Sequence, residues 1–220
     1  MDHTISNLLR IKEEINLNNL EINKNITPKI IAVSKTFNKD KIIPLIEHGH
    51  IDFGENKVQE AMTKWSEIKE KYKNLKLHMI GKLQTNKVKY AVKIFDYIHS
   101  VDNLKLAQKI SQEQVKIKKN IKLFIQINIG NEAQKSGINI NDLEIFYKNC
   151  TQELKLNVIG IMCIPPNDEN IDKYFSKMNE LKEKFNFDEL SMGMSNDYLI
   201  AAKYGATFLR IGSKIFGSRN

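Results

Sequence analysis

Eight short apolar segments recur along the whole chain, and longer segments of helical character separate them. Each is rich in isoleucine, valine, leucine or phenylalanine and has the length of a buried strand. They lie at residues 29–35, 51–54, 77–80, 97–100, 122–128, 156–162, 189–192 and 207–211. Strands that alternate with helices are typical of parallel sheets, because parallel neighbours need a long crossover connection. Eight such units in 220 residues predict an α/β fold, a single closed (β/α)8 barrel of the TIM type, with an open doubly wound sheet as the alternative.

The segments between the apolar runs carry helical periodicity. One of them places four apolar residues on one helix face, at Tyr174, Met178, Leu181 and Phe185. Leu8, Ile11 and Ile15 also have helical spacing, and they precede the first strand. This spacing predicts an additional N-terminal helix outside the eight repeating units.

The composition is that of one globular domain over residues 1–220. With 41% hydrophobic residues the chain can form a sizeable core. No segment approaches the ~20 apolar residues of a membrane helix, and the first residues lack the layout of a secretory signal. Cys150 and Cys163 lie too far apart in the sequence to indicate a disulfide framework or a thiolate metal site. We therefore expect a cytoplasmic protein with reduced cysteines, no bound metal and no membrane partner.

The formal net charge of +8 and the pI of about 9.2 raise the question of a nucleic-acid partner. The lysines, however, are distributed along the whole chain and mixed with glutamates on helix faces. No recognition motif accompanies them. The charge is therefore interpreted as solvated surface, and no nucleic-acid partner is expected.

A lysine ends the first apolar run, and glycine-serine turns follow the last two. In a barrel, sites form where the strands end, and phosphate is commonly bound by the loops after strands seven and eight. Gly193-Met194-Ser195-Asn196 and Gly212-Ser213 occupy these two positions. A short helical turn that opens at Ser213 would offer free N–H groups and a favourable dipole. Either turn alone could simply be a helix cap, but together they predict a phosphate site.

Strand alternation predicts which side chains face the barrel axis. If Lys35 points inward, the inward set is Ile31, Val33, Lys35, Gln126, Asn128, Phe208 and Arg210. The outward set then includes Leu123, Ile125, Ile127, Leu209 and Ile211. A buried guanidinium keeps its proton and needs an acceptor. For Arg210 this acceptor could be a ring nitrogen of a ligand, or a structural carboxylate such as Glu55.

Lys35 suggests covalent chemistry with an aldehyde. Burial lowers the pKa of a lysine, and the neutral amine can attack an aldehyde to form a Schiff base. The structural alternative is a lysine whose stem covers apolar surface while its amine stays in water. A reactive lysine at one end of the chain and a phosphate site at the other point towards pyridoxal 5'-phosphate (PLP).

Six motifs occur in the same order as in one known family and extend over almost the whole chain. They are IIAVSKTF, FGENKVQEA, HMIGKLQTNK, SVD, LSMGMSND and LRIGSKIFG. On these motifs the chain resembles the pyridoxal phosphate homeostasis proteins, also called the proline synthetase co-transcribed family. That family is similar to the barrel half of alanine racemases and ornithine decarboxylases, the fold type III PLP proteins. The resemblance implies a barrel alone, usually monomeric, that helps to balance intracellular PLP (vitamin B6) and amino-acid pools.

The resemblance also implies roles for single residues. The lysine that forms the internal aldimine with PLP corresponds to Lys35. The pocket asparagine, the serine of GMS, the arginine near the pyridine nitrogen and the phosphate-binding turn correspond to Asn56, Ser195, Arg210, Gly212 and Ser213. Lys57, where an aromatic residue is common, and Lys82, in a variable slot, depart from the pattern without touching these positions.

These implications favour PLP binding with little or no turnover, and no catalytic residue is assigned. Racemisation needs two acid/base groups on opposite faces of the substrate, and in alanine racemases a second domain supplies one of them. No such domain follows here before Asn220. The alternative is a small PLP-dependent amino-acid racemase that uses Tyr198 or Tyr204, and a third hypothesis is a Schiff-base aldolase. Apo-forms of PLP enzymes are conceivable partners.

Three further positions have competing interpretations. His48 and His50 flank Gly49 at the end of an expected helix, which favours a C-cap over a metal pair. His78 lies in a strand and is interpreted as a core histidine with a satisfied hydrogen bond. Lys135, after the fifth strand, would either attract a second phosphate, and so a second PLP, or be solvated.

Overall fold

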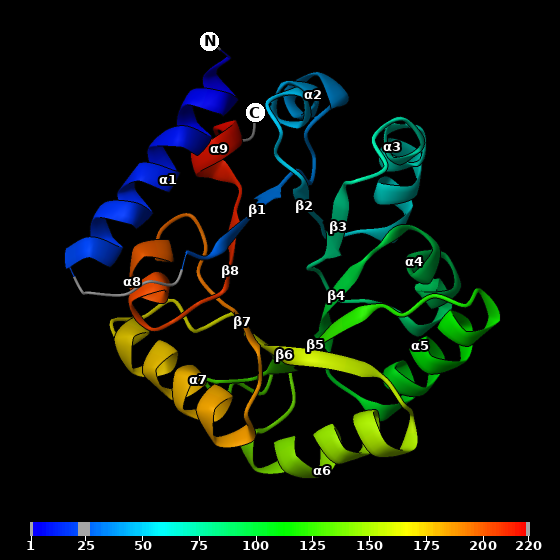
Figure 1. Cartoon of the computed structure of the whole chain (residues 1–220). Coiled ribbons are helices and arrows are strands. Elements are labelled where there is room, and N and C mark those ends of the chain that lie inside the picture. The colour runs from blue at the N-terminus through cyan, green and yellow to red at the C-terminus, as the bar shows by residue number, and fades with distance from the viewer. Residues whose placement is uncertain (1, 22–26, 219–220) are drawn as a thin grey trace.

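Eight parallel strands form a closed barrel in the order of the sequence, β1 to β8 (Figure 1). The computed structural model describes residues 2–21 and 27–218. The strands are β1 Lys29–Val33, β2 Asp52–Glu55, β3 Lys76–Met79, β4 Tyr97–Val101, β5 Lys122–Ile127, β6 Asn157–Cys163, β7 Glu189–Ser191 and β8 Phe208–Ile211. Ile31 of β1 pairs with Arg210 of β8, which closes the barrel. The predicted (β/α)8 architecture is confirmed, and each of the eight expected runs overlaps one strand, with ends that differ by at most two residues.

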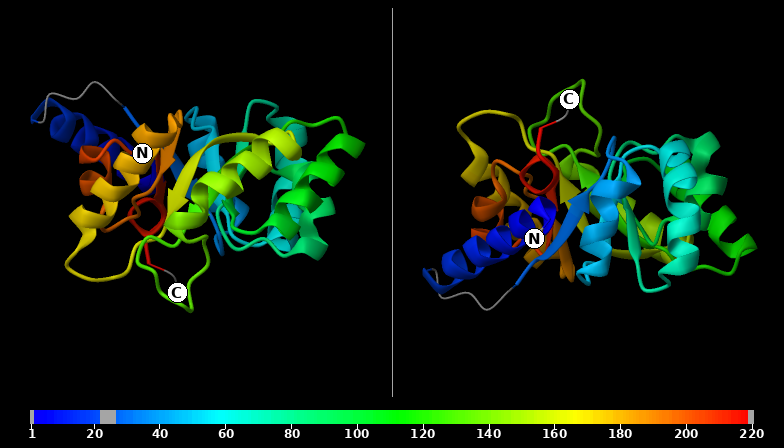
Figure 2. Two further views of the ribbon diagram at one scale, coloured as in Figure 1. Left: turned by 90° about the horizontal axis from the view of Figure 1, so that it is seen from below. Right: turned by 90° about the horizontal axis from the view of Figure 1, so that it is seen from above.

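Helices surround the barrel on its outside, as the views along and across its axis show (Figures 1 and 2). They are α1 His3–Glu21, α2 Lys39–Glu47, α3 Val58–Lys71, α4 Val88–Ile94, α5 Leu104–Lys116, α6 Leu143–Lys148, α7 Ile171–Phe185, α8 Tyr198–Lys203 and α9 Ser213–Phe216. Short 3-10 turns precede α4 at Thr85–Lys87 and α6 at Ile140–Asp142, and a π-helical turn, Asn149–Glu153, continues α6. Each connection returns the chain to the same end of the barrel. The C-terminal ends of all eight strands therefore share one face.

Apolar side chains form two layers, one inside the barrel and one between strands and helices. The inner layer consists of Ile31, Tyr97, Phe124, Met162 and Phe208. The outer layer includes Leu123, Ile125, Ile127, Leu209 and Ile211. The expected inward and outward directions are thus confirmed for β1, β5 and β8, because alternate residues of a strand face opposite sides of the sheet.

The predicted N-terminal helix is present as α1. It packs against α8 and α9, which brings the N-terminal and C-terminal segments side by side (Figure 1). Leu8, Ile11 and Ile15 form its buried face, and the Asn7 side chain donates a hydrogen bond to the Ile215 carbonyl at 3.0 Å. The helix therefore supports α9, the short helix that begins at Ser213.

The histidines beside Gly49 and the two cysteines can now be compared with their predicted roles. His48 caps α2 as expected, but His50 is buried and its Nε2 instead contacts the Asp52 carbonyl at 2.9 Å. Cys150 and Cys163 are free and buried, and burial raises the pKa of each thiol to about 12. Within residues 2–21 and 27–218, no helix has the length and apolarity needed to cross a membrane. The same residues contain no cluster of potential metal ligands.

Candidate functional site

A cavity of about 460 Å³ lies at the C-terminal ends of the strands. All six predicted site residues line it: Lys35, Asn56, Ser195, Arg210, Gly212 and Ser213. They come from the ends of β1, β2 and β8 and from the loop after β7, so the barrel joins segments that are distant in the sequence. Apolar residues, among them Ile164 and Met194, form part of the wall. The mixture of apolar surface with a few convergent polar groups is typical of a small-molecule site.

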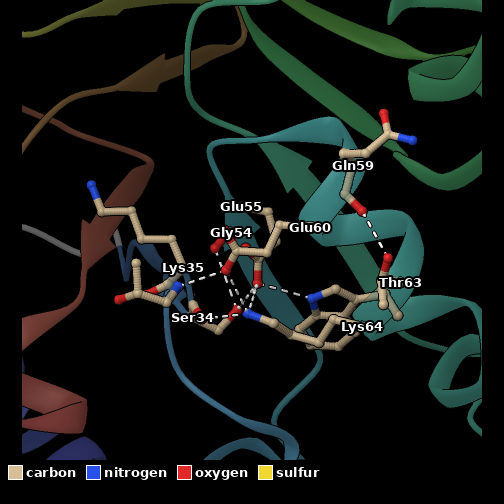
Figure 3. Close-up of polar contacts among 10 residues, drawn as sticks. Ser34, Lys35, Gly54, Glu55, Gln59, Glu60, Thr63 and Lys64 are labelled. Atoms are coloured by element: carbon tan, nitrogen blue, oxygen red, sulfur yellow. Dashed lines mark hydrogen bonds and ion pairs between the residues drawn. The ribbon is translucent and has the colours of Figure 1, made fainter.

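Lys35 is held by a network of hydrogen bonds behind its own backbone (Figure 3). The ammonium of Lys64, on α3, donates to the Ser34 carbonyl at 2.9 Å. The next peptide N–H, that of Thr36, donates to Glu60 at 2.7 Å, and Thr36 has a left-handed φ of 69°. The Lys35 side chain points away from this network and lines the cavity. The contacts on both sides of Lys35 therefore fix where its side chain leaves the strand.

Glu55 is the buried centre of this network. Its Oε1 accepts hydrogen bonds from the Ser34 hydroxyl at 2.8 Å, the Trp65 indole at 2.9 Å and the Lys64 ammonium at 3.0 Å. Glu55 therefore faces α3, outside the barrel. The alternative prediction of a structural ion pair between Glu55 and Arg210 is therefore wrong. Gly54, the preceding residue of β2, faces inward towards Ile31, so Glu55 faces outward.

Among the residues that the structure describes, Arg210 has two acceptors inside the barrel, neither of which is a carboxylate. Its Nη1 donates to the Ser191 hydroxyl and its Nη2 to the Cys163 carbonyl, both at 2.8 Å. Burial lowers the pKa of the guanidinium from its ordinary value, but arginine remains protonated in proteins. Arg210 is therefore a buried cation with two fixed donors, and it also lines the cavity.

The two glycine-serine turns meet at one edge of the cavity. The Ser195 hydroxyl oxygen accepts hydrogen bonds from the backbone N–H groups of Gly212, at 3.3 Å, and Lys214, at 3.4 Å. Its own O–H is then available to donate to a ligand. Gly193 has a φ of +89°, and a Cβ there would stand 2.5 Å from Ala201. The first turn thus requires glycine, and it brings Ser195 to the start of α9.

Asn56 contributes an unsatisfied polar atom. Among the described residues, no group bonds its buried Oδ1. The loop after β3 lies directly against the Asn56 backbone, since a Cβ on Gly81 would stand 2.4 Å from the Asn56 carbonyl. A buried amide oxygen normally has a partner, so this atom marks a position where a ligand donor would fit.

Other sequence candidates lie outside the cavity. The Tyr198 hydroxyl bonds Glu14, and the Tyr204 hydroxyl bonds Asp172 at 2.9 Å. Lys135 pairs with Glu132 at 2.5 Å and donates to the Pro165 carbonyl at 3.3 Å. Gln126 and Asn128, expected at the axis, bond to the loop that follows β5.

Known proteins share both the sequence pattern and the fold. The sequence profile of the alanine racemase N-terminal domain matches residues 12–220. The pyridoxal phosphate homeostasis protein of Haemophilus influenzae is 36% identical over 97% of this chain and 95% of its own length. That of Aquifex aeolicus is 36% identical over 87% of both chains. The chain belongs to the pyridoxal phosphate homeostasis protein family.

Two solved structures are similar to this family member in fold. PipY of Synechococcus elongatus, solved with PLP bound, has a TM-score of 0.78 and 32% identity over 92% of this chain and all of PipY. Alanine racemase of Clostridium difficile shares the fold, with a TM-score of 0.69 and 15% identity. The present chain covers 57% of that racemase.

The residues that hold the site of this family member in place were not predicted from the sequence. Lys64 and Glu60 lie one helical turn apart on α3, and this spacing in a sequence is that of an ordinary helix-surface pair. Ser191 and His99, which lie beneath Arg210, were not singled out. Alternation along β4 and β7 gave a signal for both, because it places His99 and Ser191 on the inward side of their strands.

Proposed function

We propose that this chain is a PLP-binding protein of intracellular PLP homeostasis, a single barrel domain that holds PLP as a Schiff base on Lys35. The observation that carries this proposal is the convergence of Lys35, Arg210 and the Ser195–Gly212–Ser213 turn on one cavity. The amine of Lys35 would bind the aldehyde, the N–H groups and hydroxyls of the turn would bind the phosphate, and Arg210 would donate towards the ring nitrogen. The cavity volume of about 460 Å³ lies in the range of small-molecule sites.

The polar groups and the glycine that line the cavity fit such a ligand. The buried Oδ1 of Asn56 would accept from a ring hydroxyl. A Cβ at Gly212 would stand 3.4 Å from Val33, so protein packing alone does not require glycine there. PLP supplies an electron sink when it is bound. A cationic donor at the ring nitrogen keeps that nitrogen unprotonated and weakens the sink, which favours holding the cofactor over turnover.

The contacts of the two tyrosines support binding over racemisation. Tyr198 and Tyr204 bond carboxylates on α1 and α7, and neither lines the cavity. We propose little or no turnover by a cytoplasmic monomer that exchanges PLP with apo-forms of PLP enzymes. Exchange of the Cα hydrogen of alanine in heavy water, catalysed by the protein and lost in Lys35→Ala, would instead support the racemase.

Borohydride trapping tests the proposal directly. We expect protein purified with PLP to show a visible Schiff-base absorption, and reduction to place a pyridoxyl group on the peptide that contains Lys35. Lys35→Ala should lose both signals, whereas Lys57→Ala, an exposed lysine outside the cavity, should retain them. A colourless wild-type protein, or label spread over surface lysines, would contradict the proposal.

Ser195→Ala tests the phosphate site separately. The variant removes the hydroxyl that joins the two turns and donates to the phosphate. Hydrogen bonds to charged groups contribute about 1.5–3 kcal/mol, so PLP affinity should fall about 10- to 100-fold. Fluorescence titration with PLP and with unphosphorylated pyridoxal measures the effect. Equal loss of affinity for both ligands would argue against a phosphate contact.

A further inference from the structure

A row of hydrogen-bonded polar side chains extends through the barrel interior, from the cavity at the C-terminal ends of the strands to the N-terminal end of the barrel. It begins at Arg210, whose Nη1 lies 2.8 Å from the Ser191 oxygen, and Ser191 lies 2.9 Å from His99 Nδ1. His99 Nε2 lies 3.0 Å from His78 Nδ1, and His78 Nε2 lies 3.0 Å from the Asp52 carboxylate. Asp52 begins β2, at the N-terminal end of the barrel. Five residues from five different strands thus form one continuous chain.

Each hydrogen bond in this chain has only one possible direction. Burial lowers the pKa of His78. Burial, together with electrostatic repulsion from His78 and Arg210, lowers the pKa of His99 well below its ordinary value. Both rings are therefore neutral at neutral pH. The Asp52 carboxylate accepts from His78 Nε2–H, which leaves His78 Nδ1 to accept from His99 Nε2–H. His99 Nδ1 then accepts from the Ser191 hydroxyl, whose oxygen accepts from Arg210. All donors point from the cation at one end to the carboxylate at the other.

Aromatic neighbours hold the two imidazoles in place. His78 stacks on Tyr97 and His99 on Phe124, each with ring centroids 4.2 Å apart. Phe208 lies near both imidazoles, with ring centroids 5.7 Å from His78 and 6.0 Å from His99. Hydrogen bonds that are enclosed by apolar groups are electrostatically stronger and polarise one another. The chain is therefore a rigid, directional connection.

We propose that His99, His78 and Asp52 are positioning residues that act on the cavity through Arg210. The chain keeps Ser191 as an acceptor, which fixes the guanidinium and leaves its other N–H groups for the ligand. This inference rests on the proposed function, because it assigns these residues the task of keeping the ring nitrogen of bound PLP unprotonated. Asp197, which also lines the cavity, attracts Arg210 electrostatically, but its carboxylate is bonded to the Met194 N–H.

Variants along the chain test this role with two readouts. Long-range proton–nitrogen NMR of the apo-protein should show both His78 and His99 as Nε2–H tautomers. PLP labelled with 15N in its ring then reports protonation of the ring nitrogen in the holo-protein. In Asp52→Asn, His99→Phe and Ser191→Ala, the midpoint pH of ring-nitrogen protonation should rise by about one unit. The reason is that Arg210 is no longer held in place, which weakens its charge-assisted hydrogen bond to the ring nitrogen.

Matched variants separate positioning from general destabilisation. Tyr97→Phe changes the same interior layer, and His50→Gln removes a buried histidine next to Asp52, but neither belongs to the chain. Both should keep the wild-type midpoint. His99→Gln, which retains a donor and an acceptor, should restore part of the shift seen in His99→Phe. If His99→Phe does not fold, Ser191→Ala, the smallest change, still tests the inference.

The outcomes distinguish this inference from the proposed function. If wild-type protein forms no Schiff base with PLP, the proposed function fails, and the tautomers alone then test the chain. If wild-type protein binds PLP but the three chain variants keep its ring-nitrogen midpoint, the positioning role is overturned. Nδ1–H tautomers in the apo-protein would overturn the direction of the chain.

Discussion

Replacing Lys64 by methionine is expected to lower the free energy of unfolding by about 3–5 kcal/mol, the usual cost of breaking a buried ion pair. Glu55 is fully buried, and the Lys64 side chain is 10% exposed. Without the ammonium, the Glu55 carboxylate keeps the Ser34 hydroxyl and the Trp65 indole as its donors within the described part of the chain. Because a folded domain is stable by about 5–15 kcal/mol, this loss is a large fraction of the total. Denaturant unfolding of the apo-protein measures it.

Lys39→Met is the matched control for this prediction. Lys39 pairs with Glu67 at 2.7 Å, but the two side chains are 44% and 81% exposed. Such surface pairs contribute about 0–1 kcal/mol, so the control should be nearly neutral. Adding Glu55→Gln to Lys64→Met should recover part of the loss, because no buried charge then lacks its partner. Equal losses of unfolding free energy in Lys64→Met and Lys39→Met would show that the buried network stabilises the protein no more than a surface ion pair does.

Lys64→Met should also weaken PLP binding by about tenfold, because it removes one hydrogen bond from a charged donor. The lost bond is the one to the Ser34 carbonyl, directly before Lys35. Glu60 would still bond the Thr36 N–H on the other side. Stability and ligand affinity are thus expected to be linked at this strand end, because the Lys64 ammonium bonds both the buried Glu55 carboxylate and the backbone beside Lys35.

Most of the fold followed from the sequence because the barrel repeats one local pattern eight times. Short apolar runs gave the strands, and 29–35 exceeded the observed β1, Lys29–Val33, by two residues. Ser34 and Lys35 belong to the predicted segment but lie beyond the observed strand, and Thr36, directly after them, adopts a left-handed conformation. Such an end depends on Glu60 and Lys64 of α3, which no local pattern reveals.

The site was predictable where it depends on strand ends, and not where it depends on contacts across the barrel. Lys35, Ser195 and Gly212 follow the ends of strands, and a barrel gathers all strand ends on one face. The partners of Arg210 lie on β6 and β7. Their heights along the barrel axis depend on the stagger between strands, which a sequence does not specify. For the same reason His78 was recognised as a core histidine but not as part of a chain.

Mild acid is expected to destabilise the apo-protein well before its carboxylates titrate. Burial lowers the pKa of His50 from 6.5 to about 4, and it also lowers the pKa values of His78 and His99. In the unfolded chain all three would take up protons near pH 6.5. Between the two values the unfolded state binds more protons than the folded state, so stability decreases as the pH falls.

The size of this loss of stability follows from the pKa of His50. The interval from 6.5 to about 4 corresponds to about 3 kcal/mol from His50 alone. Carboxylates with lowered pKa values act in a lower window: Glu113, whose pKa its bonds to Lys109 and Lys116 lower to about 2, loses its contribution only as the pH falls below 4.5. Destabilisation between pH 6.5 and 4.5 is therefore attributable to histidines.

Denaturant unfolding at a series of pH values tests this account, with His50→Gln as the diagnostic variant. The variant should lose less stability than the wild type between pH 7 and 4, by about 3 kcal/mol at the acid end. His48→Gln, a change at the exposed end of α2, should follow the wild-type curve. A wild-type stability that stays constant from pH 7 to 5 would contradict neutral buried histidines. It would also remove the basis for a hydrogen-bond chain in which His78 and His99 each donate through Nε2 and accept through Nδ1, because that direction requires both rings to be neutral.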